Sequence, residues 1–212
     1  MQLIAYGAQD AFLTGSPDIT FFKVVYRRHT NFAIESIRQT FSGNPTWGSS
    51  ASVTIGRHGD LINRCYIEAK LPGKGHDDYN YVESVGHVFI KEVELEIGGQ
   101  KIDKHYGEWL EIWSELTLTS EKANGYDRMV GKQTSHFDAD MMTEGNSIFI
   151  PLQFFFCRNP GLALPLIALQ YHDVKLNFKF NTFEECCTSH TNSQREEIHP
   201  TLWVDYIYLD ND

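Results

Sequence analysis

The feature that most constrains the fold is a strict alternation of apolar and charged residues in several short segments. In Glu92–Ile97 every second residue is apolar and the residues between them are glutamates. Successive side chains of a β-strand point to opposite faces, so this pattern predicts a strand with one buried face. Gly98 and Gly99 follow, and a second extended run resumes at 100–103. Because both glycines tolerate positive φ, the segment predicts a tight antiparallel hairpin.

Other segments support a chain made mainly of strands. Residues 61–71 and 174–180 alternate in the same way, whereas 148–156 and 202–209 are uniformly apolar, as expected where both faces are covered. Pro151 cannot donate to a sheet, which favours an edge position or a bulge. Weaker strand patterns cover 32–41 and 52–55.

One segment has helical periodicity instead. Between Trp109 and Leu116 the apolar residues recur at three- and four-residue spacing, with glutamates on the other face, which predicts a short amphipathic helix lying on the sheet. Ser16-Pro17 could begin a second short helix, although residues 19–26 could equally be extended. The segments expected to form loops are 42–50, 73–80, 121–146, 158–165 and 184–200. The whole pattern predicts an all-β antiparallel sandwich with one or two short helices, and the long loops favour a jelly roll.

Charge and cysteine usage narrow the classes of function. The 212-residue chain has a formal net charge of −10, so we expect no direct binding to nucleic acid. Its four cysteines form no C-x-x-C pair, and free thiols in a reducing compartment are the simplest interpretation. No window is apolar enough to predict insertion into a membrane.

The sequence offers no convincing catalytic or metal site. The nine histidines include no H-x-H or H-E-x-x-H pattern, so we expect neither a metal nor a cofactor. Acidic pairs such as Glu184-Glu185 lack a supporting motif, and the D-x-D at Asp138 and Asp140 lacks the spacing of a calcium loop. We therefore expect no enzyme. Aromatic residues in or beside loops could stack on sugars or anchor an interface: Trp47, Tyr79, Tyr81 and Tyr126.

Ser16–Phe32 is a stretch that matches no catalytic motif. Phe21, Phe22 and Tyr26 stand in it beside the cations Arg27 and Arg28. Adhesive apolar residues next to charge, outside any expected strand of the sandwich, indicate contact with a partner protein. We expect these five residues to lie in an assembly interface.

Four segments together resemble the major capsid proteins of nucleocytoplasmic large DNA viruses. The run at Ser16–Phe32 is similar to that family's N-terminal signature, and Tyr6–Asp10 with Leu13–Gly15 resembles its opening. Phe155–Val174 resembles a mid-domain segment that reads N-P-G-L-A-L-P-L-I-A-L-Q-Y-H. Leu202–Asp210 resembles the strand that closes the family's first domain.

This resemblance implies an eight-stranded jelly roll over 32–212, preceded by an N-terminal arm over 1–31, with the family's second jelly roll absent from the chain. It implies a structural virion protein that forms capsomers in an icosahedral shell, assembled in the host cytoplasm. The implied partners are other capsid protein copies, as a homotrimer, and minor capsid proteins. A carbohydrate-binding or host-attachment jelly roll is the alternative.

Overall fold

The computed structural model describes residues 31–73, 80–132, 145–188 and 197–210. The chain divides into two compact units, and the larger one, 34–208, carries both sheets. The smaller unit comprises 1–33 and 209–212. Within its described residues, the backbone N–H of Asp210 donates to the carbonyl oxygen of Asn31 at 3.1 Å.

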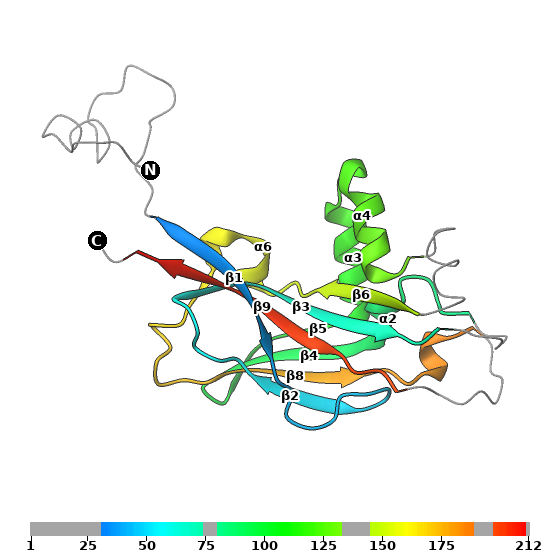
Figure 1. The fold of residues 1–212 in the computed structure, drawn as a ribbon, viewed down its shortest axis with the longest axis horizontal. Coiled ribbons are helices and arrows are strands. Elements are labelled where there is room, and N and C mark those ends of the chain that lie inside the picture. The colour runs from blue at the N-terminus through cyan, green and yellow to red at the C-terminus, as the bar shows by residue number, and fades with distance from the viewer. Residues whose placement is uncertain (1–30, 74–79, 133–144, 189–196, 211–212) are drawn as a thin grey trace, which may run out of the picture. The chain divides into compact units, whose positions relative to one another are not determined.

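The larger unit is built from two antiparallel sheets, which Figure 1 shows in two layers. The first sheet has the order β1-β9-β3-β6, and the second has the order β2-β8-β4-β5. The strands of the first sheet are β1 (Phe32–Gln39), β9 (Thr201–Leu209), β3 (Leu61–Leu71) and β6 (Asn146–Pro151), with the two-residue β7 (Leu164–Pro165) paired to β3. Those of the second are β2 (Ser50–Thr54), β8 (Val174–Phe180), β4 (Ile90–Ile97) and β5 (Gln100–Tyr106).

The structure confirms the jelly-roll sandwich but corrects its strand count. The two four-stranded orders supply eight strands, and β7 makes nine in the described part of the chain. Proline at the second position of β7 limits how far that strand can pair, because proline has no N–H to donate.

The alternating segment 174–180 behaves as the sequence predicts, whereas the alternation of 61–71 is interrupted by a register shift between Ile62 and Arg64. Along β8 the residues Val174, Leu176, Phe178 and Phe180 are all buried, and they face the core that both sheets share. The β4–β5 hairpin turns at Gly98 and Gly99, with φ of 59° and 82°. These are left-handed conformations that residues with a Cβ adopt only with strain, so the glycine pair decides the turn.

Two predictions about the middle of the chain are wrong. Residues 148–156 are not one uniformly buried strand, because β6 ends at Pro151 and the short helix α6 (Phe155–Arg158) follows. Within β6, Ile148 and Ile150 are buried while Phe149 is 37% exposed, since one face of this strand is open. The expected edge position of Pro151 is confirmed, because β6 ends the first sheet.

The expectation of a loop over 121–146 and of only one or two helices is also wrong. Residues Ser120–Val130 form the helix α4, which follows α3 (Gly107–Thr117), and α2 (Val85–Phe89) precedes β4. Asn124 and Gly125 have low helix propensity, so the sequence of 120–130 does not predict a helix by itself. Tertiary packing overrides that propensity, because Val130 is buried in α4 and Gly131 ends the helix in a left-handed conformation. Two short 3₁₀ turns, η1 (Pro160–Leu162) and η2 (Glu184–Cys186), lie within other expected loops.

Candidate interaction surfaces

The predicted assembly residues lie outside the part of the chain that the structure describes. This holds for Phe21, Phe22, Tyr26, Arg27 and Arg28, and their role stays a prediction. The D-x-D segment at 138–140 and the aromatic Tyr79 also lie outside the described residues. The candidate interaction surfaces among the described residues lie on the sandwich and its helices.

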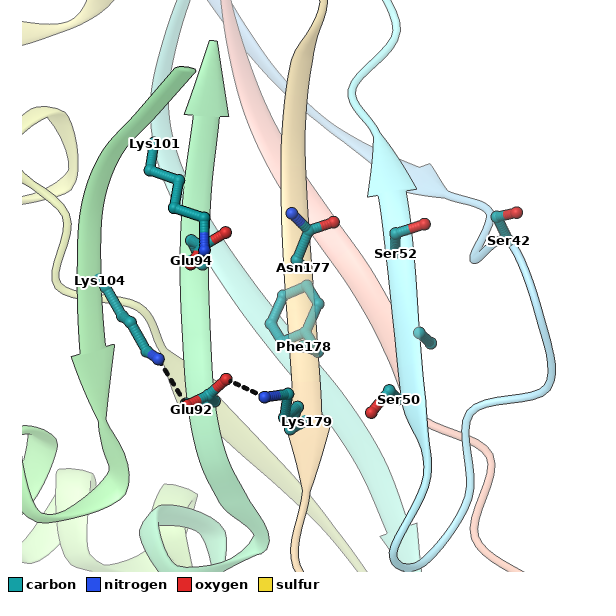
Figure 2. Close-up of a pocket in the computed structure, with 11 residues that line it drawn as sticks. Ser42, Ser50, Ser52, Glu92, Glu94, Lys101, Lys104, Asn177, Phe178 and Lys179 are labelled. Atoms are coloured by element: carbon teal, nitrogen blue, oxygen red, sulfur yellow. Dashed lines mark ion pairs between the residues drawn. The ribbon is translucent and has the colours of Figure 1, made fainter. Parts of the chain in front are cut away.

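The outer face of the second sheet is a network of ion pairs around a depression of about 400 Å³. Figure 2 shows Glu92 on β4 between two lysines from the neighbouring strands. Its carboxylate lies 2.6 Å from Lys104 Nζ and 2.7 Å from Lys179 Nζ. Hydrogen bonds from Lys104, which has the larger effect, and from Lys179 lower the pKa of Glu92. This carboxylate is therefore ionised near neutral pH and cannot act as a general acid there.

The same face carries paired charges rather than exposed aromatic rings in the part of the chain that the structure describes. Lys101 Nζ lies 2.9 Å from Glu94 Oε2, so this second glutamate is also paired with a lysine. Among the described residues that line this depression, Phe178 is the only aromatic one, and it is 1% exposed. These residues therefore offer no exposed ring on which a sugar could stack.

A buried histidine anchors the helical hairpin α3–α4 to the sandwich. His87 on α2 is 2% exposed, with Nδ1 at 2.5 Å from Glu111 Oε2 and Nε2 at 3.0 Å from the Tyr126 hydroxyl. Burial lowers the pKa of His87, although the hydrogen bond to Glu111 opposes that shift. A neutral ring then donates through Nδ1–H to Glu111 and accepts at Nε2 from Tyr126. Lys132 adds a pair with Glu115 at 2.7 Å.

The anchored helix α3 presents an apolar stripe to solvent. Trp109 is 36% exposed, Ile112 is 51% exposed and Leu116 is 76% exposed. The prediction that the apolar face of this helix lies on the sheet is therefore only partly right, because Leu110 alone among its large apolar residues is buried. An exposed apolar stripe on a firmly held helix is typical of a protein–protein contact.

A second apolar surface lies on the segment that follows α6. The guanidinium of Arg57 donates to the carbonyl oxygens of Leu169 at 3.0 Å, of His172 at 3.2 Å and of Gln170. This brace fixes a turn whose tips, Ile167 and Tyr171, are 75% and 87% exposed. Apolar side chains on a preorganised turn lose little conformational entropy on contact with a protein.

A third feature is a groove of about 460 Å³ between β3, the α3–α4 hairpin and α6. Three cations line it, Arg64, Lys122 and Arg158, and the guanidinium of Arg158 lies 5.0 Å from the ring centre of Trp113. Cys65 and Cys157 also line the groove. Nothing in the spacing of these residues along the sequence indicates that they meet.

The histidines do not gather into a metal site within the described ranges. No group of three or more His, Cys, Asp or Glu side chains there is placed to hold an ion. His105 on β5 is buried and packs on Phe154 with the ring centres 4.5 Å apart, and neither of its ring nitrogens is hydrogen-bonded to a described residue. No described helix is both long enough and apolar enough to cross a membrane.

Comparison with known proteins assigns the fold to a family. The family described as "Major capsid protein N-terminus" matches residues 20–210. The chain is 52% identical to the major capsid protein of Pyramimonas orientalis virus, covering 100% of this chain and 53% of that protein. It is 45% identical to the major capsid protein of Paramecium bursaria Chlorella virus 1, covering 99% and 47% respectively.

A solved structure agrees with the sequence relatives. A quasi-atomic structure of the PBCV-1 virus capsid superposes with a TM-score of 0.77 at 40% sequence identity, over 90% of this chain and 46% of that one. The chain spans about half the length of the curated relatives it matches. The fold, the sequence motifs and these matches agree, and the chain belongs to the family of major capsid protein N-terminal domains of large DNA viruses.

Proposed function

We propose that this chain is a structural protein of the shell of a large icosahedral DNA virus, in which its copies pack into capsomers. The observation that carries the proposal is the family match over 20–210, together with the superposition on a virus capsid. The described surfaces are consistent with it. They include exposed apolar side chains on the anchored helix α3 and at Ile167 and Tyr171 on the braced turn. A shell needs repeated adhesive interfaces rather than chemistry.

The proposed partners are other copies of the capsid protein, arranged as a homotrimer, and minor capsid proteins. Assembly is proposed to take place in the host cytoplasm. In the relatives the matched region is about half of a longer protein, so a capsomer would also contain the remaining half. A second jelly roll there would double the number of sandwich lobes in each trimer.

The N-terminal arm, 1–31, is proposed as an assembly segment. Phe21, Phe22 and Tyr26 supply apolar contact area, and Arg27 and Arg28 supply charge that suits acidic surfaces of neighbouring copies. A chain with a net charge of −10 offers many such surfaces. The two arginines are therefore assigned to protein contacts rather than to DNA.

Light scattering and circular dichroism on the full chain and on a variant lacking residues 1–30 test both proposals. The full chain should associate as its concentration rises, whereas the shortened chain should stay monomeric and keep the circular dichroism of a β-sandwich. A full-length variant carrying Arg27→Glu and Arg28→Glu should associate less, and the double reversal Lys70→Glu with Arg128→Glu, at two exposed cations on β3 and α4, is the matched control. Equal association with and without the arm would contradict the role of the arm, and saturable glycan binding on an array would favour the attachment alternative.

A further inference from the structure

Two cysteines that are far apart in the sequence line the same groove beside the helical hairpin. Cys65 on β3 is 1% exposed, and Cys157 lies on α6. The connection that leads into α6 is tied to β3, because the backbone N–H of Leu152 donates to the carbonyl oxygen of Cys65 at 2.9 Å. Both cysteines are free. The pair is thus preorganised on rigid elements.

The two thiols differ in their access to solvent. Cys157 is partly exposed within the groove, whereas Cys65 is buried beneath it. The hydrogen bond to Cys157 and burial raise the pKa of Cys65, so its thiol stays protonated and unreactive until its partner changes. An oxidant entering the groove therefore reaches Cys157 first.

The groove also has a charge opposite to that of the chain. Arg64, Lys122 and Arg158 line it, and within the described part of the chain none of the three forms an ion pair. The chain as a whole carries a formal charge of −10. A small anion is consequently attracted at this groove while most of the surface repels it.

We propose that Cys65 and Cys157 are a disulfide-forming pair, which an anionic disulfide such as oxidised glutathione closes through the cationic groove. The Cys157 thiolate attacks one sulfur of oxidised glutathione, and the first glutathione leaves as a thiolate. Cys65 then gives its proton to that thiolate, and its sulfur attacks the mixed disulfide on Cys157, releasing the second glutathione. The protein loses two electrons and two protons, and one oxidised glutathione becomes two reduced molecules.

The biological role of this disulfide rests on the proposed function in a capsid shell, whereas the thiol chemistry itself does not depend on that function. Inside a cell the pair is reduced, and outside the cell a disulfide can persist. A bond formed after a particle leaves its host would link β3 to α6 across the edge of the first sheet. The cross-link would stabilise the sandwich only after release.

The test treats the folded full chain with oxidised glutathione in mildly alkaline buffer, then blocks the remaining thiols and maps peptides by mass spectrometry. Two of the four thiols should disappear, and a peptide joining Cys65 to Cys157 should appear, while Cys186 and Cys187 remain free. Closure should raise the Tm by roughly 5–15 °C, as expected for a cross-link across a long loop in a domain of this size. Cys157→Ser should lose no thiol and show no rise in Tm.

Comparing disulfides of opposite charge tests separately whether the cationic groove attracts the oxidant. Oxidised glutathione should react at least about threefold faster than the cationic disulfide cystamine at low salt, with the ratio falling toward one at high salt. The double variant Arg64→Gln and Lys122→Gln should lose this preference, and Lys70→Gln, elsewhere on β3, should keep it. The proposal is overturned if no Cys65–Cys157 peptide forms, if glutathione stays on Cys157 as a mixed disulfide, or if cystamine reacts faster. Because these measurements use the isolated chain, a failure to assemble would leave them interpretable.

Discussion

The buried imidazole of His105 should make the stability of the sandwich depend on pH. It lies on β5 at 5% exposure with neither ring nitrogen hydrogen-bonded to a described residue. Burial lowers its pKa from 6.5 to about 4, with Arg158 adding to the shift and Asp103 opposing it. Replacing His105 with Phe or Leu removes the titrating group and keeps an apolar contact with Phe154.

The size of the effect follows from the shift in pKa. Because the folded pKa of His105 lies below the unfolded one, the folded state binds fewer protons in this range. Its contribution is fully present above about pH 6.5 and is lost as pH falls toward about 4. At about 1.4 kcal/mol for each unit of pKa, this single histidine accounts for about 3 kcal/mol between neutral and acidic solution. Near neutral pH the variants should be at least as stable as the parent, since a buried unpaired polar ring is costly.

Urea unfolding at a series of pH values measures this directly. Carboxylates also titrate on acidification, but they are shared by the parent and the variants, so the difference between their free energies of unfolding isolates His105. That difference should change by about 3 kcal/mol in favour of the variants as the pH falls from about 7 to about 4. Parallel curves for the parent, His105→Phe and His105→Leu would refute the reasoning.

Two further substitutions test particular contacts. Gly107→Ala should lower the free energy of unfolding by more than about 2 kcal/mol, because its Cβ would lie 2.2 Å from the carbonyl oxygen of His87. The control is Gly125→Ala in α4, where no atom lies within 4 Å of the added Cβ, and it should raise the free energy of unfolding by up to about 1 kcal/mol in the same urea titration. Similar losses of stability in the two variants would contradict this account. Arg57→Ala should increase amide hydrogen exchange in residues 166–172 by about tenfold or more, because the turn loses three hydrogen bonds. Unchanged protection from amide hydrogen exchange would mean that the turn is ordered without Arg57.

The alternating strands were predictable because each one carries its pattern within its own sequence. In Glu92–Ile97 and 174–180 the alternation reports directly which side chains face the core, and Gly98-Gly99 marks the turn between β4 and β5. The same local logic identified α3. It failed for α4, where Asn124-Gly125 weakens the helix pattern and packing supplies the stability instead.

The candidate surfaces were much less predictable. The sequence pattern placed the apolar face of α3 on the sheet, but the structure leaves Trp109, Ile112 and Leu116 exposed. The brace from Arg57 to the turn at 169–172 crosses more than a hundred positions of sequence. No periodicity encodes such contacts, because they depend on how the connections between strands run.

The sequence by itself determined the strand-rich class, the β4–β5 hairpin and the motifs of a capsid family. Those properties are local, since side-chain alternation, glycine conformation and short motifs act over a few residues. Tertiary structure alone decided which apolar residues stay exposed, that His105 is buried with no hydrogen bond to a described residue, and that Cys65 and Cys157 line one groove with three cations. The physical reason is that burial and proximity belong to the packed sandwich as a whole, and strands distant in sequence supply the two sides of each contact.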